Sequence, residues 1–496
     1  MSEFLLALDQ GTTSSRAILF DRAGRELAKR HVGVKQVYRR PGWVEQDANE
    51  IFESQMKAAR DVLFSMSVSA QDVEAIGIAN QRETTVIWDI RTGEPIHPAI
   101  VWQSRQTEKI CQALRERGLE GFFRDRTGLL LDAYFSGTKI RFILDEVPNG
   151  QERASRGEIA FGTIDSWLIF KMTEGRVHAT DPTNASRTLL FDIRRGAWDN
   201  ELLEALDISE KILPEVRNSN GDFGETKIFG GSIPITAVLG DQQAALFGQG
   251  CFSPGSAKNT YGTGCFFLLN VGGKVGSSDP KLLETIAWCL DGKSDYAVEG
   301  SVFTAGSAIQ WLRDGLGLIE SAEESAGAAL SVEDMGGVYF VPAFVGLGAP
   351  HWDASARGMI IGLTHGTTRE QVIRATLESL AYQTYEVLEC ALRGSALTLS
   401  KLRVDGGASR NDFLLQFQAD LLGIPVERPK SLEVTAFGVA ALAGLKRGFW
   451  ESKKDLATLV GESSRVFEPK ISEDRRQSQL EGWKRAVVRA KEWDQG

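Results

Sequence analysis

Two short apolar runs that flank a polar, glycine-containing turn occur twice in this chain, about 250 residues apart. Residues 4–8 and 17–20 flank the first turn, at 9–16, and residues 257–270 repeat the pattern around a second Gly/Thr turn. Apolar runs around a turn of this kind predict a β-hairpin. Two related hairpins so far apart favour two related domains that face each other across a cleft, which constrains the fold strongly.

The length of 496 residues also argues for more than one domain. Strand-like and helix-like patterns alternate throughout, which predicts an α/β fold. We place the domain boundary near residues 248–255, so that the domains span 1–250 and 251–496. The clearest elements are expected strands at 75–79 and 401–404 and expected helices at 50–64, 371–392 and 434–445.

Composition excludes several classes of function. The net charge of −10 argues against a general nucleic-acid-binding protein. No apolar stretch reaches the roughly 18 residues that a membrane span needs, and no signal peptide is visible. The five cysteines are scattered and form no CxxC pair, so buried reduced thiols are expected rather than disulfides or a zinc site. We therefore expect a cytoplasmic protein.

The first turn carries groups that suit a phosphate ligand. Gly11 permits a tight turn and a close backbone approach. Thr12, Thr13 and Ser14 offer hydroxyl and amide donors to phosphate oxygens, and Asp9 could hold Mg²⁺ directly or through water. The same residue types dominate ordinary polar turns, so a purely structural turn remains an alternative.

Three glycine-rich turns, at 11–14, 262–264 and 405–407, strengthen the phosphate interpretation because a nucleoside triphosphate needs several cradling loops. The two familiar nucleotide motifs are absent. Residues 292–294 read Gly-Lys-Ser, but Ala287 stands where a Walker A loop requires its first glycine. No GxGxxG follows a strand, so a Rossmann dinucleotide site has no support.

Four side chains in two polar clusters have the chemistry that a neutral polyol requires: Arg82, Glu83, Asp241 and Gln242. The arginine supplies donors, the carboxylates supply acceptors, and the amide supplies both. A carboxylate beside a hydroxyl can also take its proton as the oxygen attacks phosphorus. The alternatives are a solvated Arg82–Glu83 surface pair and a helix N-cap at Asp241. Trp102 and Phe266 are either core aromatics or the wall of a polyol pocket.

Longer motifs around these residues resemble the FGGY carbohydrate kinases of the actin/Hsp70-like ATPase superfamily, nearly from end to end. The Asn-Gln-Arg-Glu-Thr setting of Arg82 and Glu83 favours the members that phosphorylate glycerol over the sugar kinases. The matching motifs lie at 7–16, 41–45, 80–85, 134–139, 183–188, 240–248, 259–266 and 362–383.

This resemblance implies two RNase H-like domains that flank a nucleotide cleft. It implies ATP-dependent phosphorylation of glycerol to sn-glycerol 3-phosphate, as in glycerol catabolism, with Asp241 as the general base and Asp9 serving Mg²⁺. The implied glycerol site consists of Arg82, Glu83, Trp102, Tyr134, Asp241, Gln242 and Phe266. The implied nucleotide site consists of Thr12, Thr13, Ser14, Arg16, Thr263, Gly306, Gln310, Gly407 and Asn411.

The implied partners are glycerol and ATP, with a homodimer or homotetramer as the assembly. Fructose 1,6-bisphosphate inhibition is not expected, because residues 228–235 lack the arginine that some bacterial members use. Two alternatives stay open. One is a kinase of the same family for a pentulose, erythritol or dihydroxyacetone. The other is an actin/Hsp70-like ATPase without a small acceptor.

Overall fold

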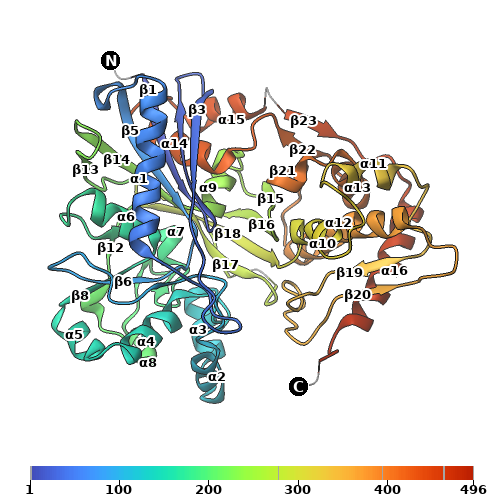
Figure 1. Ribbon diagram of the computed structural model, residues 1–496, viewed down its shortest axis with the longest axis horizontal. Coiled ribbons are helices and arrows are strands. Elements are labelled where there is room, and N and C mark those ends of the chain that lie inside the picture. The colour runs from blue at the N-terminus through green and yellow to red at the C-terminus, as the bar shows by residue number, and fades with distance from the viewer. Residues whose placement is uncertain (1–2, 277–278, 394, 462–463, 495–496) are drawn as a thin grey trace.

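The computed structural model describes residues 3–276, 279–393, 395–461 and 464–494. It contains two large β-sheets with helices packed against them (Figure 1). The strands of the first sheet come from residues 4–240, and those of the second come from residues 257–467. Figure 1 shows the first sheet in blue to green and most of the second half of the chain in yellow to red on the other side. The predicted α/β class is confirmed.

The first sheet has the strand order β13-β14-β5-β1-β2-β3. β1 and β2 form the antiparallel hairpin that the first turn predicts, while β5 runs parallel to β1 and β14 runs parallel to β5. The expected strand at 75–79 is confirmed within β5. The bounds are β1 Phe4–Gln10, β2 Ser14–Phe20, β3 Glu26–Gly33, β5 Val73–Asn80, β13 Glu225–Thr226 and β14 Ile233–Gly240.

The second sheet has the order β17-β18-β16-β15-β21-β22-β23. Its core repeats the first sheet, because β18, β16 and β15 are antiparallel neighbours and β21 and β22 follow in parallel. This repetition agrees with the paired RNase H-like domains. The bounds are β15 Ala257–Tyr261, β16 Cys265–Gly272, β17 Leu283–Leu290, β18 Lys293–Val302, β21 Leu402–Asp405, β22 Val426–Pro429 and β23 Ser464–Phe467.

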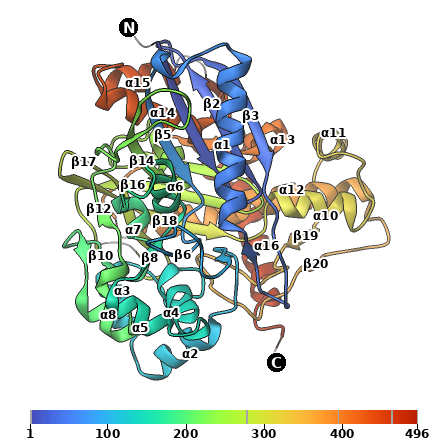
Figure 2. The same cartoon turned by 60° about the vertical axis from the view of Figure 1, so that its left-hand side comes forward.

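Two long helices cover the sheets where the sequence predicts them. α1 (Ala48–Ser65) lies on β2 and β3, as Figure 2 shows, and begins after Asp47, whose carboxylate accepts hydrogen bonds from two backbone amides of the first turn. α12 (Arg369–Leu392) packs on β16 and β18 and begins with a capping box that Thr368 and Gln371 form. Both helices bury an apolar face against their sheet.

α14 (Val434–Lys446) crosses from the second half of the chain to the first sheet. It packs on β5, β1 and β14 and on α9 (Asp241–Gly248). A Cβ atom on Gly438 would collide with the carbonyl group of Ala244, and one on Gly248 would collide with that of Val434. Glycine is therefore required for this close crossing. The boundary near residue 250 separates the strands but not this helix, and the two domain ranges stay predictions.

The remaining elements fill the space around the sheets. In the first half they are β4 Glu45–Gln46, β6 Val86–Asp89, β7 Ala99–Ile100, α2 Glu108–Glu116, α3 Glu120–Thr127, α4 Ser136–Glu146, α5 Gly150–Arg156, β8 Ile159–Gly162, α6 Ile164–Met172, β9 Ala179–Thr180, α7 Pro182–Ala185, β10 Phe191–Asp192, β11 Ala197–Trp198, α8 Asn200–Leu206 and β12 Glu215–Val216. In the second half they are α10 Gly306–Asp314, α11 Glu324–Leu330, β19 Tyr339–Val341, β20 Met359–Ile361, α13 Asp412–Leu422, α15 Lys453–Gly461 and α16 Glu473–Ala490. Within the described ranges, no helix combines the length and apolar character that crossing a bilayer requires.

Candidate active site

The carboxyl ends of three neighbouring parallel strands bring together the predicted catalytic residue, two predicted substrate-binding residues and the predicted metal-binding residue. Asp9 lies at the end of β1, Arg82 and Glu83 follow β5, and Asp241 follows β14. The strand register places Asp9 beside Ala79 and Gly240 beside Asn80. Ligands of open α/β sheets bind at the carboxyl ends of their strands, so this edge is the natural place for a site.

Asp241 is the first residue of α9, and Gly240 occupies the N-cap position. Oδ1 of Asp241 accepts a hydrogen bond of 2.8 Å from the backbone amide of Gln242 and lies 3.4 Å from Nε of Arg82. Burial raises the pKa of Asp241, and the Arg82 guanidinium opposes that rise. Because Gly240 and not Asp241 is the N-cap, the N-cap alternative is wrong. The Asp241 side chain is 28% exposed.

Arg82 and Glu83 are buried, so the alternative of a solvated surface pair is wrong. Both terminal nitrogens of Arg82 contact the carboxylate of Glu299, at 2.5 Å and 3.0 Å. Glu83 accepts a hydrogen bond of 2.6 Å from Nε of Arg187, and burial raises its pKa against the two arginines. Two residues outside the predicted set, Glu299 and Arg187, therefore complete this cluster.

The two added residues differ in the signal that they left in the sequence. Arg187 lies in one of the matching motifs, at 183–188, but its local pattern is that of a loop. Glu299 is the charged residue in the buried end of β18, residues 297–302, and it is fully buried. A glutamate in such a strand indicates a buried partner, because a charge is seldom buried without one. The sequence does not reveal which partner it has.

Trp102, Tyr134 and Phe266 form one aromatic wall. The ring centroids of Trp102 lie 5.6 Å from those of Tyr134 and 6.1 Å from those of Phe266. Nε1 of Trp102 donates a hydrogen bond of 2.9 Å to the hydroxyl of Thr12. All three rings are half-buried, which suits a pocket wall better than a core. Trp102 thus connects the first turn to the second hairpin, which carries Phe266.

Gln242 is held by a buried lysine that the sequence analysis missed. Nζ of Lys258 donates to Oε1 of Gln242 at 2.5 Å, to the hydroxyl of Thr260 at 2.8 Å and to the backbone carbonyl of Phe266 at 3.1 Å. Burial lowers the pKa of Lys258 to about 8, although nearby carboxylates oppose the shift. The lysine links two predicted substrate residues.

Asp9 and Arg16 face each other across the first hairpin and form an ion pair of 2.8 Å. Burial raises the pKa of Asp9, while Arg16 lowers it. Oδ2 of Asp9, the oxygen that forms this ion pair, is buried and makes no further hydrogen bond within the described residues. In the described part of the chain, no group of three or more His, Cys, Asp or Glu residues could hold a metal. A lone buried carboxylate still fits Mg²⁺, which commonly takes one or two protein carboxylates together with phosphate oxygens and water.

The second and third glycine-rich turns meet at one edge of the second sheet. Thr260 and Asp405 are paired in the parallel register of β15 and β21, so the residues that follow them are neighbours. The amide of Gly306 donates to the carbonyl of Gly262 at 3.0 Å, which brings the start of α10 to the same place. Thr263 and Gly407 are exposed there. The structure therefore brings three members of the predicted nucleotide set, Thr263, Gly306 and Gly407, to one place.

Two other members of that set belong to helices that follow these turns. Gln310 is exposed on α10, one turn after Gly306. Asn411 is the N-cap of α13: its side-chain oxygen accepts from the amide of Leu414 at 3.1 Å, and its amide group donates to the hydroxyl of Ser325 at 3.1 Å. Asn411 has a clear structural function, and its contact with a nucleotide stays a prediction.

Comparison with protein families identifies the fold. Residues 4–248 match the N-terminal domain of the FGGY family of carbohydrate kinases, and residues 257–446 match its C-terminal domain. The chain belongs to the FGGY family. A glycerol kinase of Caldanaerobacter subterraneus subsp. tengcongensis is 55% identical to this FGGY chain over 495 residues, or 99% of each protein. Glycerol kinase 2 of Thermotoga maritima is 54% identical over 494 residues and again covers 99% of each.

Solved structures agree with this assignment. The crystal structure of Plasmodium falciparum glycerol kinase with ADP has a TM-score of 0.92 and 35% identity, and the match covers 98% of each chain. The xylulose kinase of Lactobacillus acidophilus has a TM-score of 0.86 at 19% identity, with 98% of this chain and 97% of that one covered. At that identity the second match concerns the fold alone. The two-domain FGGY fold is therefore confirmed.

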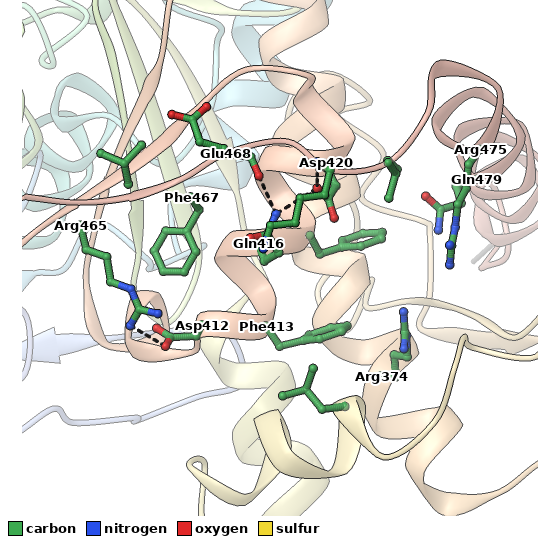
Figure 3. Close-up of a pocket in the computed structure, with 15 residues that line it drawn as sticks. Arg374, Asp412, Phe413, Gln416, Asp420, Arg465, Phe467, Glu468, Arg475 and Gln479 are labelled. Carbon is green, nitrogen blue, oxygen red and sulfur yellow. Dashed lines mark hydrogen bonds and ion pairs between the residues drawn. The ribbon is translucent and has the colours of Figure 1, made fainter.

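A separate cavity of about 630 Å³ lies in the second half of the FGGY chain, between α13, β23 and α16 (Figure 3). The rings of Phe413 and Phe467 face it, and Gln416 at its side donates to the carbonyl of Glu468 at 2.7 Å. The predicted glycerol and nucleotide residues are not among those that line it. This cavity is therefore not the candidate active site.

Proposed function

We propose that this FGGY chain is an ATP-dependent kinase that phosphorylates a terminal hydroxyl of glycerol and releases ADP and sn-glycerol 3-phosphate. The observation that carries the proposal is the convergence of Arg82, Glu83 and Asp241 beside an aromatic wall. A neutral polyol presents hydroxyls that need charged donors and acceptors, and a carbon face that suits aromatic rings. Full-length relatives named glycerol kinase support the same substrate.

The polyol hydroxyls are bound from two sides. Nε of Arg82 offers a donor, and Glu83 and Gln242 offer acceptors, all in a buried environment where such hydrogen bonds are strong. Trp102 and Phe266 exclude water from the carbon face. This division explains why the pocket accepts a small triol, whose every oxygen finds a partner.

Asp241 acts as the general base. Its carboxylate accepts the proton of the terminal hydroxyl as that oxygen forms a bond to the γ-phosphorus of ATP. The bond from the γ-phosphorus to the bridging oxygen breaks in the same step, and ADP leaves with that oxygen. Burial raises the pKa of Asp241 and so makes the carboxylate a better proton acceptor, while the Arg82 guanidinium opposes that rise.

The nucleotide lies between the glycine-rich turns in this proposal. Thr12, Thr13 and Ser14 on one side, and Thr263 and the 405–407 turn on the other, offer donors to the phosphates. The buried Asp9 carboxylate would hold Mg²⁺. Bound Mg²⁺ would neutralise charge on the phosphates. Arg16 pairs with Asp9 and, at 3.2 Å, with Glu433, so it holds the carboxylate from the side.

The cellular setting is part of the proposal. The described residues include all five cysteines, each free and buried, which suits a reducing compartment such as the cytoplasm. The homodimer or homotetramer stays a prediction from the family resemblance. Light scattering of the purified chain would measure it.

The decisive experiment is ATP turnover with a panel of acceptors and identification of the product. We expect turnover that depends on glycerol, with sn-glycerol 3-phosphate as the product. Preferential turnover of a pentulose, erythritol or dihydroxyacetone would replace the substrate within the family. ATP hydrolysis that ignores every polyol would overturn the proposal in favour of an ATPase without a small acceptor.

A further inference from the structure

Four buried side chains form a closed ring of alternating charge beneath the polyol site. Arg82 contacts Glu299, Glu299 contacts Arg187, Arg187 contacts Glu83, and Glu83 returns to Arg82. The four distances are 2.5, 3.0, 2.6 and 3.9 Å in that order. None of these residues is more than 3% exposed. The ring has no net charge, which allows it to be buried.

The ring joins the two halves of the chain. Arg82 and Glu83 follow β5 in the first sheet, and Arg187 follows α7. Glu299 comes from β18 of the second sheet, where its strand neighbours are Leu268 and Leu283. A strand in the middle of a sheet is a rigid support, so the second half presents this carboxylate at a defined place.

Glu299 determines which edge of Arg82 is available. The carboxylate occupies both terminal nitrogens of the guanidinium, and Oε1 of Gln243 lies 3.3 Å from one of them. The remaining edge, with Nε, points toward Asp241 at 3.4 Å. A planar guanidinium that is gripped at two nitrogens cannot rotate, so its third donor has a fixed direction.

We propose that Glu299 is a positioning residue for the polyol site, which fixes from the second half the arginine that binds the substrate. Arg187 shares the task, because it orients Glu83 and the same Glu299 carboxylate. This inference rests on the proposed function and adds that the polyol site is completed by both halves of the chain.

The charges of the ring support a directional effect. Burial alone would raise the pKa of Glu299, but the guanidinium groups of Arg187 and Arg82 lower this pKa to about 2. The carboxylate is therefore ionised at every working pH. Without that charge, two guanidinium groups face only Glu83 and Asp241. The Arg82 guanidinium would then lose the grip on its two terminal nitrogens, and its Nε donor would no longer have a fixed direction in the polyol site.

The experiment compares E299Q, which removes the charge, with E299D, which keeps the charge but shortens the side chain. We expect the KM for glycerol to rise about tenfold or more in E299Q, the scale of a lost charged hydrogen bond, and by less in E299D. The Kd for ADP is expected to stay within about twofold, because the nucleotide turns do not contact the ring. E378Q is the matched control, since Glu378 is a buried glutamate paired with Arg374 in the same half.

A merely structural ion pair would give a different pattern. It would raise the glycerol KM and the ADP Kd together as the halves loosen, and that result would overturn the proposal. So would a folded E299D or E299Q whose glycerol KM equals that of the parent. If E299Q does not fold, the double variant E299Q/R187Q keeps the ring neutral, and we expect it to fold with a raised glycerol KM.

The same assay separates this inference from the proposed function. A parent chain that does not phosphorylate glycerol refutes the function. A parent chain that does, with unchanged KM in the folded ring variants, refutes only the positioning role. Glycerol affinity by calorimetry in the presence of ADP gives the same answer without turnover.

Discussion

The carboxyl edges of the two sheets share one strand order but present different chemistry. The first edge adds charged side chains, among them Asp9, Arg82 and Asp241, to a glycine- and hydroxyl-containing turn at 11–14. The second carries glycines and hydroxyls in the turns 262–264 and 405–407. Under the proposed function, the same scaffold provides directional side chains where a proton moves, and exposed backbone where phosphate oxygens approach closely.

The two edges also differ in how deeply their residues are buried. Arg82 and its partners are buried in a neutral ring, so each donor has a fixed direction. Thr263 and Gly407 are exposed and leave room for a ligand. The predictions below test this division of labour, from the largest expected effect to the smallest.

Asp241→Asn tests whether the proton acceptor belongs to the first edge. The amide cannot take the proton, so kcat is expected to fall about 10²- to 10⁴-fold, the range of general-base catalysis. ADP affinity should remain, because the second edge is intact. Steady-state kinetics and calorimetry measure the two quantities. A variant that retains turnover would show that another residue is the general base and would contradict the assignment of proton transfer to the first edge.

Glu378→Gln tests a buried carboxylate that has one arginine partner, in contrast to the neutral ring of two arginines and two glutamates around Arg82. Burial raises the pKa of Glu378 to about 7, although Arg374 lowers it. The folded protein therefore keeps this proton better than the unfolded chain, and stability present below pH 4.5 is lost as the pH rises to about 7.

In the Gln variant that loss disappears. The free energy of unfolding of the variant should rise by about 3 kcal/mol relative to that of the parent as the pH increases from 5 to 8. Urea unfolding at both pH values measures the difference, with the exposed Glu53→Gln on α1 as the control. Parallel pH profiles for parent and variant would contradict the assignment.

Arg82→Ala removes the directional donor of the first edge. We expect the KM for glycerol to rise roughly thirtyfold, which corresponds to a loss of about 2 kcal/mol of binding free energy, with little change in the KM for ATP. Arg60→Ala on the exposed face of α1 serves as the control. An unchanged glycerol KM would exclude Arg82 from the pocket.

Gly406→Ala and Gly407→Ala test the second edge. Gly406 has a φ of +87°, and a Cβ atom there would collide with the backbone of Tyr261. A Cβ on Gly407 would meet no atom within 4 Å. The first variant should weaken ADP binding about tenfold by displacing the turn, and the second should weaken it less. The reverse order would show that the loop conformation does not limit nucleotide binding.

Local patterns predict most of the fold and many of the site residues. Both hairpins, the strand before Arg82 and the helices at 50–64 and 371–392 follow from apolar periodicity and turn residues, and the structure contains them. The polar clusters were assigned to strand ends, and parallel pairing then places those ends together. The choice of glycerol came from the resemblance and not from spacing.

Other features have no local signal. Arg82 and Glu299 are 217 positions apart, and Lys258 reaches Gln242 only because β15 passes beside α9. The crossing of α14 onto the first sheet likewise joins segments from opposite ends of the chain. Their local sequence shows a charge or a glycine, but not its partner.

The sequence by itself determined the two-hairpin α/β plan, the glycine-rich turns and the residue types at the strand ends, because these depend on neighbours a few positions away. Only the tertiary structure decided which charges neutralise one another beneath the site and which half supports Arg82. Those pairings are settled when burial removes water, since a buried charge must then find whichever opposite charge the packed sheets bring within reach.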